Sequence, residues 1–380
     1  MRNGWQTTRL SEVLEKTETV NPLDFPNTEF AYIDVSSISN TTFEIAATQC
    51  LKGKDAPSRA RKLVRANDVL FATIRPTLRR IAVVPDMLDR QVCSTGYFVL
   101  RTKQGIDHRF IFYWLFTEDF LGQMESLQKG ASYPAVTDGD VRSQEISFPP
   151  LPEQQRIVAL LDEAFAGLAT AKANAERNLQ NARAIFESHL QAVFSQRGEG
   201  WLETTLDRIS TNLDSKRVPI TKNVRSSGEY PYYGASGIVD YVADYIFEGD
   251  NLLVSEDGAN LLARSTPIAF SVSGKYWVNN HAHILHFENM ATRRFVEFYL
   301  QSIKLDEYVT GAAQPKLNQK ALNSIPVPIP SSLEMQAQIV ESVETLQKET
   351  QHLTRLYERK LAALGELKKS LLHQAFNGEL

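Results

Sequence analysis

Cysteine is scarce in this sequence, and signals for export or membrane insertion are missing. The 380 residues include two cysteines, Cys50 and Cys93, and no Cys-x-x-Cys pair. This count argues against a disulfide framework or a zinc cluster and fits the reducing cytoplasm, with both thiols free and buried. No apolar run approaches the ~18 residues of a membrane span. The opening MRNGWQTTRL has no apolar stretch of the kind found in signal peptides.

Catalytic motifs are also missing. The sequence has no Asn/Asp-Pro-Pro-aromatic tetrapeptide, because residues 21–23 (Asn-Pro-Leu) and 148–151 (Phe-Pro-Pro-Leu) both depart from it. Residues 234–237 (Gly-Ala-Ser-Gly) are not followed by the Lys-Ser/Thr of a phosphate-binding loop, and His-Glu-x-x-His does not occur. His281 and His283 are two residues apart, which is typical of one face of a strand rather than of a metal site. We therefore predict a chain without a catalytic centre or a metal site of its own.

Charge is unevenly distributed along the chain. The 41 Lys and Arg residues and the 45 Asp and Glu residues give a net charge of −4. Residues 51–90 contain ten basic and four acidic side chains, a local charge of +6, so the remainder carries −10. A basic segment in an acidic chain is typical of a phosphate-binding surface, but it is equally compatible with a solvated face. The charge pattern alone leaves both interpretations open.

The two halves of the chain resemble each other. Six short segments recur in the same order at offsets of 181 to 196 residues, and so many ordered matches indicate a duplicated unit. The matched pairs are 4–5 with 200–201, 67–70 with 249–252, 110–115 with 295–300, 130–134 with 311–315, 154–158 with 336–340, and 188–194 with 370–376. Each copy is predicted to be a globular part followed by a long helix.

Both copies contain a long stretch without proline, 153–196 and 333–376. Within each stretch apolar residues recur at alternating spacings of four and three, counted from Ile157 in the first and Ile339 in the second. This period predicts two helices of about 44 residues, roughly 65 Å long, that pair as a coiled coil. Its seams include Ile185 in the first helix and Leu353 and Leu367 in the second.

The chain ends predict how the two copies connect. The first helix leads through 194–201 (FSQRGEGW) into the second copy, and residues 376–380 followed by 1–5 would read similarly if they were joined. We therefore expect the two termini to lie close together, in a circular arrangement with pseudo-twofold symmetry. Such an arrangement requires the two long helices to run antiparallel.

The predicted globular parts, 1–150 and 199–330, have the pattern of α+β domains. Short apolar strands between turns are predicted at 69–72, 81–84 and 96–100 in the first part, and at 252–254 and 282–285 in the second. A short aromatic helix follows in each, at 108–116 and 293–303. The long helices with their connections occupy 151–198 and 331–380, which makes four segments in all.

The loops between the matched segments differ strongly between the copies. Residues 58–65 (SRARKLVR) and 73–80 (TIRPTLRR) are basic, whereas 215–237 mix basic side chains with tyrosines and 255–264 read SEDGANLLAR. Such side chains can hydrogen-bond phosphates and base edges, although an ordinary polar surface has the same composition.

Together these features resemble the specificity subunit of type I restriction–modification systems over nearly the whole chain. The resemblance is carried by Pro-x-Pro…Glu-Gln-x-x-Ile-Val at the start of each long helix, by the Gly-Ala-x-x-Pro step before it, and by residues 230–237 (YPYYGASG) with 256–258 (Glu-Asp-Gly). The second copy has Met335 where the first has Glu153, a small departure. The family implies two target recognition domains, each reading one half of a bipartite, asymmetric DNA target. It also implies that the helices set the unread gap and dock two methyltransferase subunits.

The resemblance further implies the partners, cofactors and location. It implies double-stranded DNA, two methyltransferase (M) subunits, restriction–translocase (R) subunits and a cytoplasmic location without membrane contact. No cofactor is expected in this chain, while S-adenosylmethionine, ATP and Mg would be bound by the partner subunits. The predicted DNA contacts of the first copy are Arg59, Arg61, Lys62, Arg65, Arg75, Arg79, Arg80 and Tyr133. Those of the second copy are Lys216, Arg217, Tyr233, Ser236, Asn260, Arg264, Gln314 and Lys316.

Two other classes of function remain open. The chain can be a coiled-coil scaffold whose globular parts bind proteins, and salt-sensitive DNA binding would distinguish this from the first interpretation. A stand-alone methyltransferase or nuclease is the third class, against which the missing motifs argue. The sequence does not specify the bases that would be read.

Overall fold

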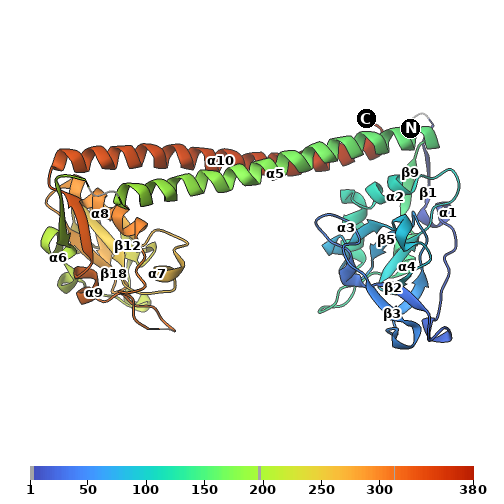
Figure 1. Ribbon diagram of the computed structural model, residues 1–380, viewed down its shortest axis with the longest axis horizontal. Coiled ribbons are helices and arrows are strands. Elements are labelled where there is room, and N and C mark those ends of the chain that lie inside the picture. The colour runs from blue at the N-terminus through green and yellow to red at the C-terminus, as the bar shows by residue number, and fades with distance from the viewer. Residues whose placement is uncertain (1–3, 196–197, 312) are drawn as a thin grey trace. The chain divides into compact units, whose positions relative to one another are not determined.

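The chain folds into two compact units, each containing a globular part and half of each long helix (Figure 1). The computed structural model describes residues 4–195, 198–311 and 313–380. Unit 1 runs from the start of the chain to Ala175 and includes Arg359–Leu380, and unit 2 is Glu176–Glu358. Across these described ranges, no helix combines the length and apolar character needed to span a membrane.

The two long helices are present as predicted. Helix α5 spans Leu151–Ser195 and helix α10 spans Leu333–Asn377, 45 residues each. Helix α10 begins beside Ser332, whose hydroxyl accepts a hydrogen bond from the Met335 amide at 3.4 Å. It ends at Gly378, whose φ of +66° suits the left-handed conformation that commonly follows a helix.

Within each unit the beginning of one long helix packs against the end of the other. In unit 1, Ile157 and Leu161 of α5 share a core with Leu372 and Ala375 of α10. In unit 2, the α5 residues Leu190 and Phe194 share a core with the α10 residues Val340 and Val343. The Asn178 amide of unit 2 also donates to the Tyr357 hydroxyl at 3.2 Å. The helices are therefore antiparallel in both units.

The buried face of the helices departs from the predicted seven-residue repeat. Ile185, Leu353 and Leu367 are 50%, 38% and 47% exposed, so their placement in the seam is wrong. The next residues, such as Phe186 and Lys368, are half-buried instead. A strict seven-residue repeat assumes 3.5 residues per turn, and a helix with 3.6 moves its buried face by one position over several turns.

Unit 1 contains two main sheets and one terminal strand pair. The strand orders are β6-β5-β8 and β3-β2-β7-β4, and β1 pairs with β9. Its elements are β1 (Gln6–Arg9), α1 (Leu10–Val13), β2 (Glu29–Ile33), β3 (Gln49–Lys52), β4 (Ala60–Leu63), β5 (Val69–Ala72), β6 (Ile81–Val83), β7 (Val92–Ser94), β8 (Tyr97–Leu100), α2 (His108–Trp114), α3 (Glu118–Leu127), α4 (Asp138–Arg142) and β9 (Glu145–Phe148).

Unit 2 repeats this plan. The strand orders are β11-β18-β15-β16 and β13-β12-β17-β14, and β10 pairs with β19. Its elements are β10 (Trp201–Thr205), α6 (Leu206–Ile209), β11 (Thr211–Asn212), β12 (Ser227–Gly234), β13 (Gly237–Val242), β14 (Phe247–Glu248), β15 (Asn251–Ser255), α7 (Asn260–Ala263), β16 (Ala269–Val272), β17 (Lys275–Val278), β18 (Ala282–His286), α8 (Met290–Ser302), α9 (Gln319–Asn323) and β19 (Pro326–Pro330).

The repeat extends into segments where the sequence shows no similarity. Strands β2 and β7 are parallel neighbours in the second sheet of unit 1, and β12 and β17 are parallel neighbours in the same positions of unit 2. The first and last strands of each globular part pair antiparallel. The predicted α+β class and internal duplication are therefore confirmed, and the strand order is the same in both copies except for the added edge strand β11 in unit 2.

A cluster of three aromatic rings joins each globular part to the end of a long helix. In unit 2, the Phe295 ring lies 5.9 Å from Trp201 and 5.1 Å from Phe194, at the end of α5. In unit 1, the Phe110 ring lies 6.4 Å from Trp5 and 4.8 Å from Phe376, at the end of α10. In unit 1, the end of α10 therefore occupies the position that the end of α5 occupies in unit 2. This confirms the predicted circular arrangement of the chain.

The shared glutamine at the start of each long helix is buried in both copies. Gln154 is 0% exposed, donates to the carbonyls of Pro149 and Gly105, and accepts from the Asp107 amide. Gln336 is 5% exposed, donates to the Pro330 carbonyl and accepts from the Thr292 hydroxyl. Buried polar groups need such partners. The repeated Gln-x-x-Ile-Val motif therefore attaches each helix to its own globular part.

The two cysteines differ in environment. Cys93 lies on the inner strand β7, and burial raises the pKa of its thiol to about 12. Cys50 lies on β3, at the edge of the same sheet, and is exposed, so the prediction that both thiols are buried is wrong for Cys50. An edge strand leaves one face and one side open to solvent, which the local sequence does not reveal.

Candidate nucleic-acid interface

Each unit brings two loops together by the same backbone hydrogen bonds. In unit 1, the Arg75 amide donates to the Pro134 carbonyl at 2.7 Å, and Lys129 and Ala135 exchange two bonds of 2.9 Å. In unit 2, the Gly258 amide donates to the Pro315 carbonyl at 3.0 Å. Thr310 and Lys316 exchange bonds of 2.9 and 2.7 Å. We call 74–80 with 130–135, and 257–264 with 313–316, the paired loops of units 1 and 2.

The repeated Gly-Ala-x-x-Pro step has a conformational reason. Gly130 and Gly311 have φ values of +100° and +87°, which side chains rarely adopt. A Cβ atom on Gly311 would lie 2.5 Å from the Gln314 carbonyl oxygen. Each glycine closes its loop. The carbonyl of the proline four residues later then accepts the hydrogen bond from the Arg75 amide in unit 1 and from the Gly258 amide in unit 2.

The paired loops of unit 1 present a cation beside an exposed ring. The Arg75 guanidinium lies 5.0 Å from the centre of the Tyr133 ring and donates to the Ser132 carbonyl at 3.3 Å. Tyr133 is 71% exposed. Arg79 is exposed on the same loop, but it lines a hollow of about 1300 Å³ that also includes Lys368 of α10. The structure therefore brings Arg75 and Tyr133 together and directs Arg79 toward the helices.

Most other basic candidates of unit 1 have partners inside the unit. Arg59 is exposed. Arg61 donates to Asn21 at 2.7 Å, and Lys62 donates to Asp138 and to the Tyr97 carbonyl at 2.7 Å each. Arg65 donates to Glu18 at 2.5 Å, and Arg80 donates to the Val35 carbonyl at 2.6 Å. The basic window around residues 51–90 is thus partly neutralised by contacts that its sequence does not predict.

The candidates of unit 2 also divide into exposed and internal side chains. Lys216, Ser236 and Gln314 are exposed. Tyr233 is half-buried against Phe270 and Tyr276, and the Asn260 amide donates to the Thr266 carbonyl. The Arg264 guanidinium donates to the carbonyls of Leu300 and Ile303 at 3.1 and 2.6 Å, at the end of α8, and burial lowers its pKa. The contact of each with DNA stays a prediction.

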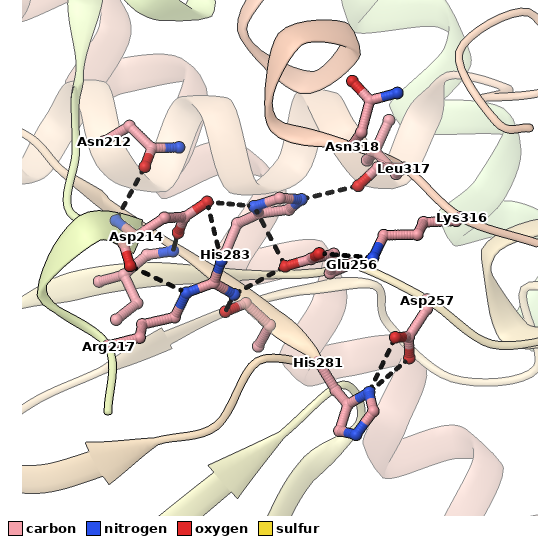
Figure 2. A network of polar contacts seen from close by, with 12 residues as sticks. Asn212, Asp214, Arg217, Glu256, Asp257, His281, His283, Lys316, Leu317 and Asn318 are labelled. Atoms are coloured by element: carbon pink, nitrogen blue, oxygen red, sulfur yellow. Dashed lines mark hydrogen bonds and ion pairs between the residues drawn. The ribbon is translucent and has the colours of Figure 1, made fainter. Parts of the chain in front are cut away.

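Arg217 and Lys316 belong to a buried network of charged side chains, which Figure 2 shows from close by. The Arg217 guanidinium donates to Glu256 Oε2 at 2.7 Å and to the Ala282 carbonyl at 2.8 Å, and lies 3.4 Å from Asp214 Oδ2. Lys316 Nζ lies 3.1 Å from Glu256 Oε1. His283 lies 2.5 Å from Asp214 through Nδ1 and 2.7 Å from the Leu317 carbonyl through Nε2.

His283 lies between two hydrogen-bond acceptors. Its Nδ1 faces the Asp214 carboxylate and its Nε2 faces the Leu317 carbonyl. Asp214, Glu256 and His283 offer ligand atoms within 4.8 Å of one another, but each of these atoms faces a protein partner. In the structure these side chains form an ion-pair network. Sequence reasoning did not single out Asp214, and it named Glu256 and His283 without predicting that the three meet, because nothing local reveals that they are buried together.

A second histidine–carboxylate pair lies at the edge of the same loops. His281 Nδ1 lies 2.8 Å from Asp257 Oδ2, and the His281 side chain is 48% exposed. Its backbone carbonyl accepts from the Glu256 amide at 2.8 Å, so the turn before β18 adjoins the paired loops. The sequence analysis placed His281 with His283 on one face of a strand, whereas His281 lies in the turn before β18 and at this surface.

The family follows from comparison with known proteins. The chain matches the model of the type I restriction modification DNA specificity domain over residues 2–177 and 198–360, and it belongs to this family. A putative type I restriction enzyme specificity subunit of Haemophilus influenzae is 36% identical over 141 residues, 37% of this chain and 36% of the relative. The EcoDI specificity subunit of Escherichia coli is 26% identical over 200 residues, 52% of this chain and 42% of the relative. Each match spans less than half of the relative's length.

Two solved structures resemble the chain over its full length. One, described with the complex assembly and conformational transition of the type I R-M system, has a TM-score of 0.85 and 27% identity, and the match covers 100% of this chain and 99% of that one. The HsdS subunit from Thermoanaerobacter tengcongensis has a TM-score of 0.72 and 27% identity, with 100% and 98% covered. The architecture of two globular parts and two long helices is that of this family.

Proposed function

We propose that the chain is the non-catalytic DNA-specificity subunit of a type I restriction–modification complex. Each globular part is a target recognition domain that reads one half of a bipartite DNA sequence through its paired loops. The observation that carries the proposal is the combination of one framework with two different loop surfaces. Arg75 and Tyr133 occupy the paired loops of unit 1, whereas Asn260, Gln314 and Lys316 occupy those of unit 2. Different side chains on equal frameworks predict two different half-sites and an asymmetric target.

The long helices have two roles in this proposal. They set the gap between the half-sites, and they dock two methyltransferase subunits that bind S-adenosylmethionine and modify adenine. Restriction–translocase subunits, with ATP and Mg, join for cleavage. Family membership and the full-length similarity to an HsdS subunit support this assignment. In this proposal the complex acts on DNA in the cytoplasm.

The test is a map of DNA methylation. The chain is co-expressed with its methyltransferase partner in a host without DNA methylation, and the DNA is sequenced for modified adenine. We expect one bipartite, asymmetric motif with a fixed gap. The double variant Arg75→Ala, Tyr133→Ala should relax one half of the motif and leave the other half unchanged. A folded, partner-bound complex that yields no motif would contradict the proposal and favour the coiled-coil scaffold.

A further inference from the structure

Three separate segments of unit 2 meet at the Glu256 side chain. Arg217 comes from the loop after β11, Glu256 follows strand β15, and Lys316 belongs to the paired loop before α9. The Glu256 backbone joins the same segments, because its amide donates to the His281 carbonyl and its carbonyl accepts from the Leu317 amide, each at 2.8 Å. Figure 2 shows both carboxylate oxygens engaged, one with Arg217 and the other with Lys316.

Lys316 is the exposed member of this network. The side chains of His283, Asp214, Glu256 and Arg217 are 1%, 5%, 11% and 13% exposed, whereas that of Lys316 is 52% exposed. Arg217 and Lys316 are both cations, but Arg217 is enclosed by Asp214 and Glu256. The positive charge of the network that reaches the surface is therefore that of Lys316.

Among the residues of unit 1 that the structure describes, this arrangement has no counterpart. The backbone pairing of Asp257 with Lys316 matches that of Ile74 with Ala135, so Thr73 and Ala135 occupy the positions of Glu256 and Lys316. The bond from the Leu317 amide to the Glu256 carbonyl likewise matches the bond from Val136 to Thr73. The network is thus a property of one recognition domain and not of the shared framework.

We propose that Glu256 is a positioning residue that fixes the Lys316 ammonium at one point of the DNA-facing surface of unit 2. A lysine side chain is flexible, and holding it in place before binding lowers the entropy lost when it contacts a phosphate or a base. The inference rests on the proposed function, since it names how one half of that DNA site is organised. It predicts that removing a negative charge beside DNA weakens binding, the opposite of what charge alone would do.

The experiment measures DNA affinity of the full-length chain by fluorescence anisotropy at several salt concentrations. The probe is a labelled duplex carrying the motif found by methylation mapping. Lys316→Ala should lower the slope of log K against log salt by about 1 and weaken binding about fivefold at ~0.15 M salt. Glu256→Gln should weaken binding by a similar factor, and the double variant should bind no more weakly than Lys316→Ala alone. A purely structural role of Glu256 would instead make the two effects multiply.

Two further variants separate positioning from loss of fold. Glu256→Asp keeps a negative charge in the network but draws the carboxylate back from Lys316 and from Arg217. It should also weaken binding while the melting temperature stays within a few degrees. Glu344 of α10 lies 2.7 Å from Arg294 of α8. Glu344→Gln makes the same substitution there and should leave DNA affinity unchanged. Tighter or unchanged binding by Glu256→Gln, or independent effects in the double variant, overturns the inference. A wild-type chain that binds no duplex at low salt overturns the proposed function and the inference with it.

Discussion

At the scale of the residue, the basic side chains of unit 2 that were predicted to contact DNA fall into two groups. The guanidinium groups of Arg217 and Arg264 donate hydrogen bonds to carboxylate and carbonyl oxygens of their own unit, whereas Lys216 and Lys316 are exposed to solvent. Composition predicted all four as DNA contacts. Burial of an arginine requires internal acceptors, and these come from segments far away in the sequence. An internal arginine shapes the loop that carries the exposed side chains.

The acid stability of unit 2 should depend on Asp214. Burial acts to raise the pKa of this carboxyl, but the His283 hydrogen bond and charge, with the Ile284 amide and Arg217, outweigh it and hold the pKa below the ordinary 3.8. A carboxyl whose pKa is lowered on folding stabilises the fold at neutral pH and loses that contribution as the pH falls through its pKa. Asp214→Asn should therefore cost about 3 kcal/mol at pH 7, and the difference from wild type should shrink below about pH 4.

Urea unfolding at a series of pH values measures this difference. Glu229→Gln, at an exposed position of β12, is the control and should show no comparable loss. A difference between Asp214→Asn and wild type that stays constant from pH 7 to the acid range would contradict the assigned ion pair.

At the scale of the element, buried alanines mark the packed face of helix α5. Ala175 and Ala182 are 1% and 2% exposed, so another part of the protein packs directly over their methyl groups. The predicted seam and the observed one agree at these alanines and diverge by Ile185, which follows Ala182 by less than one helical turn. Periodicity therefore predicts that the helices pair, but the turn angle of the folded helix decides which later residues pack.

Enlarging a buried alanine should be costlier than truncating an exposed isoleucine. Ala182→Ile introduces three carbon atoms into a packed position and should destabilise unit 2 by about 1–3 kcal/mol. Ile185→Ala removes apolar surface that is already in water and should change stability by less than about 0.5 kcal/mol. Thermal denaturation of both variants measures which one loses more stability. Equal losses, or a larger loss for Ile185→Ala, would support the predicted seven-residue seam.

At the scale of the whole molecule, the chain is a duplicated framework with individual loops. Apart from the edge strand β11 of unit 2, the same strand order occurs in both units, as do the same aromatic cluster and the same buried glutamine. The networks around the paired loops differ. The total charge is −4, so attraction to DNA must come from local surfaces. The proposed M subunits would then supply much of the remaining phosphate affinity.

The isolated chain should accordingly bind DNA weakly and with a steep salt dependence. With about four phosphate contacts, the affinity should fall about 100-fold between ~50 and ~200 mM salt. Anisotropy titrations with the chain alone and with its methyltransferase partner measure the two affinities. Tight, salt-insensitive binding by the chain alone would show that it does not depend on partners for phosphate contacts.

The sequence by itself determined the duplication, the two long helices, the α+β class and the circular order of the chain. These features rest on period and on ordered matches, which are local or internal to the sequence. It also pointed to the loops at 73–80 and 255–264, since polar side chains there interrupt a repeated framework. Only the tertiary structure decided that Asp214, Glu256, His283 and Arg217 form one buried network and that Lys316 is its exposed end. Ion pairing inside a protein depends on which distant segments meet, and no pattern within a single loop records that meeting.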